Sequence, residues 1–495
     1  MRYISLLIIG ICIQFLFSHV TCAQNLTLPI AIQIAQERSY DAQRAKFSFL
    51  ASYWTYRSFK AELLPSVNLH GGLMNFNHSI VETRNYETGQ INYVNNNSLS
   101  NNLTLSIDQQ LAATGGTVSL QSYLYRLDQF SYDQITYNSQ PLRISYNQPL
   151  SAYNSLKWDK KVAPMEYEIA QRAYLTNMEQ ISLTVTNHFF NALSAQWNYK
   201  QSLATLDERE RLLKIAKERL KLGTTTQSEV LQMELSLINA RVAANKQKLT
   251  LDDMQYQLYS YLRVTDYEEV GLVAPDSVPV VWVDVADVLQ KALDNSSYKL
   301  EQQKEVLQAE RSLAQAKSNK GIQLSLRGEV GLSKSGSTFT DAYTLLKDNE
   351  IVGLSLSLPI FDWGVSKGRI QVAKSQLEVI RSRQEQEYSD YMQSLRKKVM
   401  EFNSQPTLCH DAERAMEISA ERYDIMRRRF EAGNVSVTEL NTAQQEQENA
   451  RLQYVNQIRS FWTDYFTLQR YTLYDWISQR EINLSPEQID KLIRK

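Results

Sequence analysis

Two segments of the chain alternate between apolar and polar residues, the pattern of strands with one apolar face. Each alternates over about 8–11 residues, the length of a membrane barrel strand whose outer face meets lipid. In the first, the apolar positions are Ile322, Leu324, Leu326, Val330 and Leu332; in the second, they are Val352, Leu354, Leu356 and Leu358. A half-buried strand of a soluble sandwich shows the same alternation. The helices predicted around these segments are too long for an ordinary sandwich.

Long stretches without Gly or Pro predict long helices on either side of these strands. They cover residues 165–222, 224–270 and 434–485. A helix over residues 165–222 would extend for about 87 Å. Apolar residues recur at spacings of three and four, which predicts helices that pack on other helices; the two clearest runs are Leu231, Leu235, Ile238, Val242 and Val455, Ile458, Trp462, Tyr465. Pro164 and Pro406 predict kinks or breaks.

The chain repeats itself at a fixed offset. Pro359 and Gly433 lie 210 residues after Pro149 and Gly223, and the triplet Asn-Ala-Arg at 239–241 recurs at 449–451. A repeat of this kind is one structural unit made twice. The unit reads as strand, long helix, turn, long helix.

The first copy of the unit is longer in its strand region. Before the strands the offset between the copies is 257 residues rather than 210, so the first strand region contains about 47 extra residues. Its Asn-rich part, roughly Asn75 to Asn102, predicts a long exposed loop. The Thr114-Gly115-Gly116 stretch predicts a tight turn that adds a further hairpin.

Both repeats specify two antiparallel helices joined by a tight turn. Gly223 and Gly433 are placed to end a helix in the left-handed conformation. Residues 226–229 (TQSE) and 436–439 (SVTE) then match the capping box S/T-x-x-E that begins a helix. We call the two turns the hairpin tips.

The first residues read as a secretory signal peptide. Arg2 is followed by an apolar run from Ile4 to Phe17 and by small residues before Gln24, so residues 1–23 are expected to be cleaved. An uncleaved anchor and lipidation of Cys22 remain alternatives. Cleavage leaves Cys409 as the single cysteine of the mature chain, where it is expected to be a partly buried apolar residue.

Composition and charge exclude several classes of function. With 53 basic and 54 acidic residues, the chain has no basic excess for nucleic acid. The histidines show no metal-ligand spacing, and no catalytic constellation is present, so we expect neither enzyme activity, nor a metal, nor a cofactor. The segment 328–335 resembles a phosphate loop only superficially, since Ser333 stands where Gly must precede the Lys.

A membrane sheet built from these strands cannot stand alone. Strand edges cannot stay open in hydrocarbon, and four to six strands are fewer than known single-chain barrels have. We therefore expect several copies to share one barrel, continued by the helices as a conduit. A passive outer-membrane porin would have more strands and no hairpin tips, and a soluble periplasmic coiled-coil protein would have no membrane strands.

The chain resembles the TolC-type outer-membrane efflux protein family. The resemblance rests on VGLSLSLPIFDWGVSKGRIQVAKSQLE (Val352 to Glu378), on the segment Glu421 to Leu468 that begins ERYDIMRRRFEAGN, and on Leu26 to Leu69. It implies an α+β outer-membrane protein that forms a homotrimer, with a twelve-stranded transmembrane β-barrel continued by a long periplasmic α-helical barrel. The expected domains are repeat 24–263 (strand region about 66–150, tip near 223), linker 264–283, repeat 284–475 (strand region about 321–359, tip near 433) and tail 476–495.

The resemblance also implies function, partners and site residues. Such channels work in tripartite efflux or type I secretion systems. They take substrates from a periplasmic membrane-fusion adaptor and an inner-membrane pump of the RND, ABC or MFS type and pass them to the exterior, and their barrel is surrounded by outer-membrane lipid. The expected adaptor contacts are the tip residues Gly223, Thr224, Thr225, Gly433, Asn434 and Val435. The expected tunnel constriction involves Glu439, Thr442 and Glu229. Three facing Glu439 carboxylates would raise one another's pKa and attract cations, whereas the alternative role of Glu439 is helix capping.

Overall fold

The computed structural model describes residues 26–84, 87–264, 271–275, 278–432 and 434–494. The chain divides into two compact units. One unit contains residues 1–50, 171–297 and 389–495, and the other contains residues 51–170 and 298–388. The predicted signal peptide, Cys22 and Gly433 lie outside the described residues.

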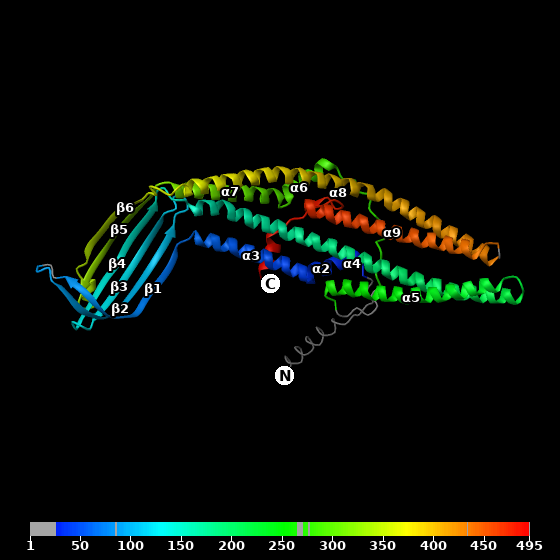
Figure 1. Ribbon diagram of the computed structural model, residues 1–495, viewed down its shortest axis with the longest axis horizontal. Coiled ribbons are helices and arrows are strands. Elements are labelled where there is room, and N and C mark those ends of the chain that lie inside the picture. Colours follow the sequence, from blue (N-terminus) through cyan, green and yellow to red (C-terminus); the bar gives the residue numbers. More distant parts are fainter. Residues whose placement is uncertain (1–25, 85–86, 265–270, 276–277, 433, 495) are drawn as a thin grey trace, which may run out of the picture. The chain divides into compact units, whose positions relative to one another are not determined.

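The internal duplication is confirmed at the level of helix boundaries (Figure 1). The paired helices have equal lengths of 11, 23, 67 and 36 residues. The pairs are α2 (Leu28–Arg38) with α6 (Val285–Asn295), α3 (Tyr40–Glu62) with α7 (Tyr298–Lys320), α4 (Ser155–Lys221) with α8 (Val365–Glu431), and α5 (Gln227–Leu262) with α9 (Val437–Thr472). From α4 onward the offset between partners is 210 residues, as the sequence predicts.

Six antiparallel strands form one sheet in the order β1-β2-β3-β4-β5-β6 within the part of the chain that the structure describes (Figure 1). They are β1 (Ser66–Arg84), β2 (Ile91–Gln110), β3 (Thr117–Gln129), β4 (Gln134–Pro149), β5 (Gln323–Gly336) and β6 (Lys347–Ser357). The first repeat thus contributes four strands and the second contributes two. The extra hairpin expected at residues 114–116 is confirmed, because β2 and β3 are joined there.

The expectation of a long Asn-rich loop is wrong. Residues 75–84 belong to β1 and residues 91–102 to β2, and the two strands pair as far as Arg84 and Ile91. Backbone hydrogen bonds hold this ribbon, and they do not depend on apolar side chains. The outer ends of β1 and β2 carry asparagines on both faces and few apolar residues. They therefore lack the apolar–polar alternation from which strands were predicted.

One face of the sheet is apolar and exposed, and the other is polar. Facing pairs such as Ile107↔Leu120 and Leu326↔Leu354 lie on the apolar face. The exposed apolar side chains on it include Val67, Leu69, Leu103, Leu105, Ile107, Leu120, Leu142, Ile144, Val330, Val352, Leu354 and Leu356. The polar face contains the ion pair of Arg143 with Glu329, at 3.3 Å. Outside the Asn-rich outer parts of β1 and β2, this division follows from the period-two alternation along the strands.

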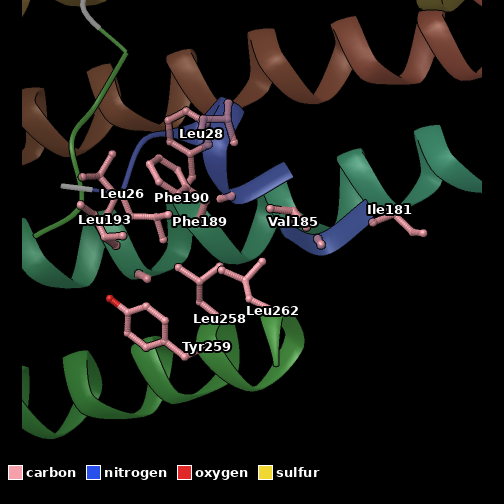
Figure 2. Packing of buried hydrophobic residues seen from close by; sticks show 14 of the residues in the cluster. Leu26, Leu28, Ile181, Val185, Phe189, Phe190, Leu193, Leu258, Tyr259 and Leu262 are labelled. Atoms are coloured by element: carbon pink, nitrogen blue, oxygen red, sulfur yellow. The ribbon is translucent and has the colours of Figure 1, made fainter. Parts of the chain in front are cut away.

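In the compact unit that contains residues 171–297 and 389–495, the long helices pack around apolar clusters. Figure 2 shows Phe189 and Phe190 of α4 against Leu258 and Leu262 of α5, with Leu28 of α2 beside them. A second cluster joins α6, α8 and α9 through Val288, Phe402 and Phe461. The predicted stripe at 455–465 is confirmed as buried, since Val455, Ile458 and Tyr465 lie in these clusters.

Neither internal proline ends its helix, so of the kinks or breaks expected at Pro164 and Pro406, the breaks are wrong and the kinks stay a prediction. Pro164 lies inside α4 and Pro406 inside α8. Phe402 and Cys409 flank Pro406 and are both buried in the same cluster, and this burial offsets the cost of the missing backbone donor. The chain ends in the short strands β7 (Tyr474–Asp475) and β8 (Arg480–Glu481) and the helix α10 (Pro486–Arg494).

Candidate functional site: the helical hairpin tips

The first hairpin tip is a Schellman turn followed by a capping box. Gly223 has φ +72°, and its N–H donates to the carbonyl of Leu220 at 3.0 Å. The N–H of Thr224 donates to the carbonyl of Arg219 at 3.0 Å. These two bonds satisfy carbonyls that the end of α4 would leave open. The positive φ explains why this position holds glycine.

Helix α5 then begins with a complete capping box. The Thr226 side chain accepts from the N–H of Glu229 at 3.3 Å, and the Glu229 carboxylate accepts from the N–H of Thr226 at 3.0 Å. Thr225 also donates its hydroxyl to this carboxylate. The pKa of Glu229 is lowered, and the hydrogen bond from Thr225 is the largest cause. The predicted capping box is therefore confirmed.

The second tip repeats this geometry in its described residues. The N–H of Asn434 donates to the carbonyl of Arg429 at 2.9 Å, matching the bond made by Thr224. Ser436 and Glu439 form the second capping box, with the Ser436 N–H donating to the Glu439 carboxylate at 2.9 Å. This backbone hydrogen bond, together with one from the Ser436 hydroxyl, lowers the pKa of Glu439.

Glu439 and Thr442 lie three residues apart on α9, and both are exposed. The hydroxyl of Thr442 donates to the carbonyl of Thr438 at 3.0 Å. Within one copy the Glu439 carboxylate is bound to its own helix start. Its pKa is lowered there, in contrast to the rise expected from three facing carboxylates. The capping role is present, and a constriction role depends on other copies.

The structure brings the two hairpin tips together through an apolar cluster. Val230 and Met233 of α5 pack with Leu212 of α4, Phe430 of α8 and Leu440 of α9. Each of the four long helices contributes a side chain to this cluster. The position of one hairpin tip is therefore coupled to that of the other.

Polar contacts between the two hairpins were not predicted from the sequence. The hydroxyl of Tyr423 (α8) donates to the carboxylate of Glu208 (α4). Burial, followed by this hydrogen bond, raises the pKa of Tyr423. The buried Arg209 donates to the side-chain oxygen of Gln444 on α9, and the Gln444 amide donates to Thr205 at 3.1 Å. We call Thr205, Glu208, Arg209, Tyr423 and Gln444 the hairpin clasp.

The residues of the clasp are not repeated in the other half of the chain. At the offset of 210 residues, Glu208 and Arg209 correspond to Ile418 and Ser419, and Tyr423 corresponds to Leu213. The clasp is therefore a contact that this chain makes once, between unlike positions of the two repeats.

Three further kinds of feature would indicate another class of site: a membrane-spanning helix, a metal-binding cluster or a reactive cysteine. Among the described helices, none is long and apolar enough to cross a membrane. Within the same described ranges, no group of three or more His, Cys, Asp or Glu side chains could hold a metal ion. Cys409 is buried, as expected, and burial raises its pKa to about 11.

Comparison with known proteins agrees with this architecture. The sequence pattern of the outer membrane efflux proteins matches residues 288–472. No curated protein matches the chain. The fold is similar to that of the Campylobacter jejuni CmeC outer membrane channel, with a TM-score of 0.63, 14% identity, and coverage of 94% of this chain and 89% of that chain.

Two further solved structures have the same fold. The outer membrane protein VceC of Vibrio cholerae has a TM-score of 0.62 at 13% identity, over 91% of this chain and 95% of that one. The Neisseria gonorrhoeae MtrE outer membrane channel in its open state has a TM-score of 0.57 at 13% identity, over 92% and 91% of the two chains. The match of residues 288–472, the duplicated hairpins and this shared fold make the chain similar to the outer membrane efflux proteins.

Proposed function

We propose that this protein is the outer-membrane channel of a tripartite efflux or type I secretion system, acting as a homotrimer in a Gram-negative outer membrane. In this proposal the repeats 24–263 and 284–475 are joined by the linker 264–283. The observation that carries it is the combination, in one chain, of a sheet with an exposed apolar face and two long helical hairpins with capped tips. A porin lacks the hairpins, and a periplasmic coiled-coil protein lacks the sheet.

Exposed apolar stripes on the helices support self-association. The predicted stripe on α5 is not covered within one copy, because Leu231, Leu235, Ile238 and Val242 are 55–62% exposed. Helix α8 also exposes Met400, Ile418 and Ile425. Side chains spaced by seven residues, as Ile418 and Ile425 are, suit a second helix that packs alongside. A neighbouring copy is the partner that would cover both stripes.

The hairpin tips are the proposed contact with a periplasmic adaptor that leads to an inner-membrane pump. Among the described tip residues, Gly223, Thr224 and Asn434 are exposed and Thr225 and Val435 are half-buried. Gly433 is proposed as a contact together with them. Glu439, with Thr442 and the repeat mate Glu229, is the proposed constriction.

Because the clasp and the apolar cluster join the two hairpins, we propose that the clasp holds the tunnel closed at rest.

The first experiment measures mass and conductance of the purified mature protein. Light scattering in detergent, corrected for bound detergent, should give the mass of three protomers. The same sample in a planar bilayer should give small, discrete conductance steps. A monomer without conductance would contradict the proposed channel.

A further inference from the structure

The sheet has more strands than the twelve-stranded barrel implied by the family resemblance requires. Twelve strands over three copies are four per chain, whereas the described part of this chain has six in one sheet. Ser66 at the start of β1 lies 257 residues before Gln323 at the start of β5, so these strands are repeat mates. Strand β4 precedes α4 as β6 precedes α8. The additional pair is therefore β2 and β3.

The additional hairpin is built like the wall of a membrane barrel rather than like a surface loop. Strands β2 and β3 pair continuously from Ser98↔Gln129 to Gln110↔Thr117. The cross-strand pairs Leu103↔Leu124 and Ile107↔Leu120 lie on the apolar face of the sheet. The neighbours of these residues on the opposite face are polar, among them Thr104, Ser106, Ser119 and Gln121. The hairpin therefore extends both faces without a break.

The sheet ends in two free edges that are suited to one another. Strand β1 is at one edge and β6 is at the other. With six strands alternating in direction, β1 and β6 run in opposite directions, so β6 of one copy beside β1 of the next continues the antiparallel order. Both edges carry exposed apolar residues, Val67 and Leu69 on β1 and Val352 and Leu354 on β6. Open backbone groups in hydrocarbon are too costly to remain unpaired.

We propose that three copies close an eighteen-stranded barrel, with β6 of each copy paired to β1 of the next. This inference rests on the proposed trimeric channel. Barrel diameter grows roughly linearly with strand number, so the pore through the membrane would be roughly 1.5 times as wide as that of a twelve-stranded barrel. Barrels of about 16–18 strands leave an aqueous channel. The membrane pore would then admit bulky, hydrated cargo, and restriction by size would fall on the hairpin tips.

Cysteine labelling tests whether β2 lies in the barrel wall. In a Cys409→Ala background, Thr104→Cys and Leu105→Cys place a thiol on the polar and the apolar face of β2. Ser355→Cys and Leu354→Cys are the matched controls on β6. In trimers reconstituted into lipid, a charged maleimide should label the cysteines at positions 104 and 355, and should not label those at 105 and 354. Equal labelling at positions 104 and 105, while position 355 is labelled and position 354 is not, would overturn the inference. The proposed channel function would be unaffected by that result.

Electron cryo-microscopy of the unaltered protein gives an independent test. Three protomers around a wall of eighteen strands is the expected result. Three protomers around twelve strands, with β2 and β3 outside the wall, would overturn the inference alone. Two protomers around twelve strands would overturn it as well, together with the proposed trimer. A protein that is monomeric and shows no alternation at 354 and 355 would contradict the proposed function itself.

Discussion

At the scale of single residues, Glu439 combines a capping role with a proposed constriction role. Glu439→Gln keeps an oxygen that accepts from the Ser436 N–H but removes the charge. Because its lowered pKa keeps the carboxylate ionised at neutral pH, we expect the variant to weaken block by divalent cations several-fold in single-channel recordings. Glu229→Gln removes the corresponding charge in the other repeat and measures how much of the block this second proposed constriction residue contributes. Unchanged block in a stable trimer would leave Glu439 with capping alone.

Glu179 is a second residue whose charge matters, and its effect is on stability. It lies in α4 and is 6% exposed, and burial followed by the negative charge of Asp475 raises its pKa from 4.5 to about 7. Burial would also raise the pKa of Asp475, but hydrogen bonds from the Ser478 N–H and the Tyr465 hydroxyl lower it overall. The proton of this acidic pair therefore resides on Glu179 near neutral pH.

The raised pKa of Glu179 predicts a loss of stability as pH rises. An acid that binds its proton more tightly when folded contributes stability below pH 4.5, and that contribution is lost as pH rises through about 7. The pKa change corresponds to at most about 3 kcal/mol. Glu179→Gln should flatten the fall in the urea midpoint between pH 5 and pH 8, followed by circular dichroism. Glu166→Gln, at an exposed position of α4, should keep the wild-type slope.

At the scale of elements, the hairpin clasp should control how easily the tips separate. Tyr423→Phe removes the hydroxyl that donates to Glu208 and leaves the ring in place. A hydrogen bond to a charged group contributes about 1.5 kcal/mol, which corresponds to roughly tenfold in an opening equilibrium. We expect a higher open probability in a planar bilayer at unchanged trimer mass. Tyr256→Phe, on the exposed surface of α5, should behave as wild type. Equal open probability in both variants would exclude the clasp as a gate.

The elements were predictable from the sequence to the extent that their signals are local. The presence of long helices, the capping boxes and the strands of the second repeat follow from periodicity and from short-range chemistry. The helix ends did not follow, because α9 ends at Thr472 and β7 and β8 lie within the Gly- and Pro-free stretch 434–485. The outer parts of β1 and β2 did not follow, because ladder hydrogen bonds between Asn-rich strands depend on pairing rather than on side-chain pattern. Neither Pro164 nor Pro406 breaks its helix, and at Pro406 the burial of Phe402 and Cys409 overrides the local propensity. The contact of Tyr423 with Glu208 joins residues 215 positions apart, which no local pattern reveals.

At the scale of the whole molecule, the exposed stripe on α5 should determine whether copies assemble. Leu235 and Ile238 are 59% and 57% exposed in one copy, although their spacing is that of a buried helix face. If a neighbouring copy covers them, charges placed there would be desolvated on assembly without a partner. Leu235→Glu combined with Ile238→Glu should therefore shift the detergent-corrected mass from three protomers toward one. The helical content should stay unchanged, since neither side chain is buried within the chain.

The control for this variant lies on the same helix. Thr250 is also exposed but lies about a quarter turn away from the stripe, so Thr250→Glu should leave the trimer intact. A trimer that survives both changes would show that the α5 stripe is not the interface between copies. Assembly would then rest on the edges of the sheet, where β1 and β6 leave backbone groups that only another strand can satisfy. Loss of the trimer in the α5 variant alone would show that the helical hairpins, rather than the membrane sheet by itself, hold three copies together.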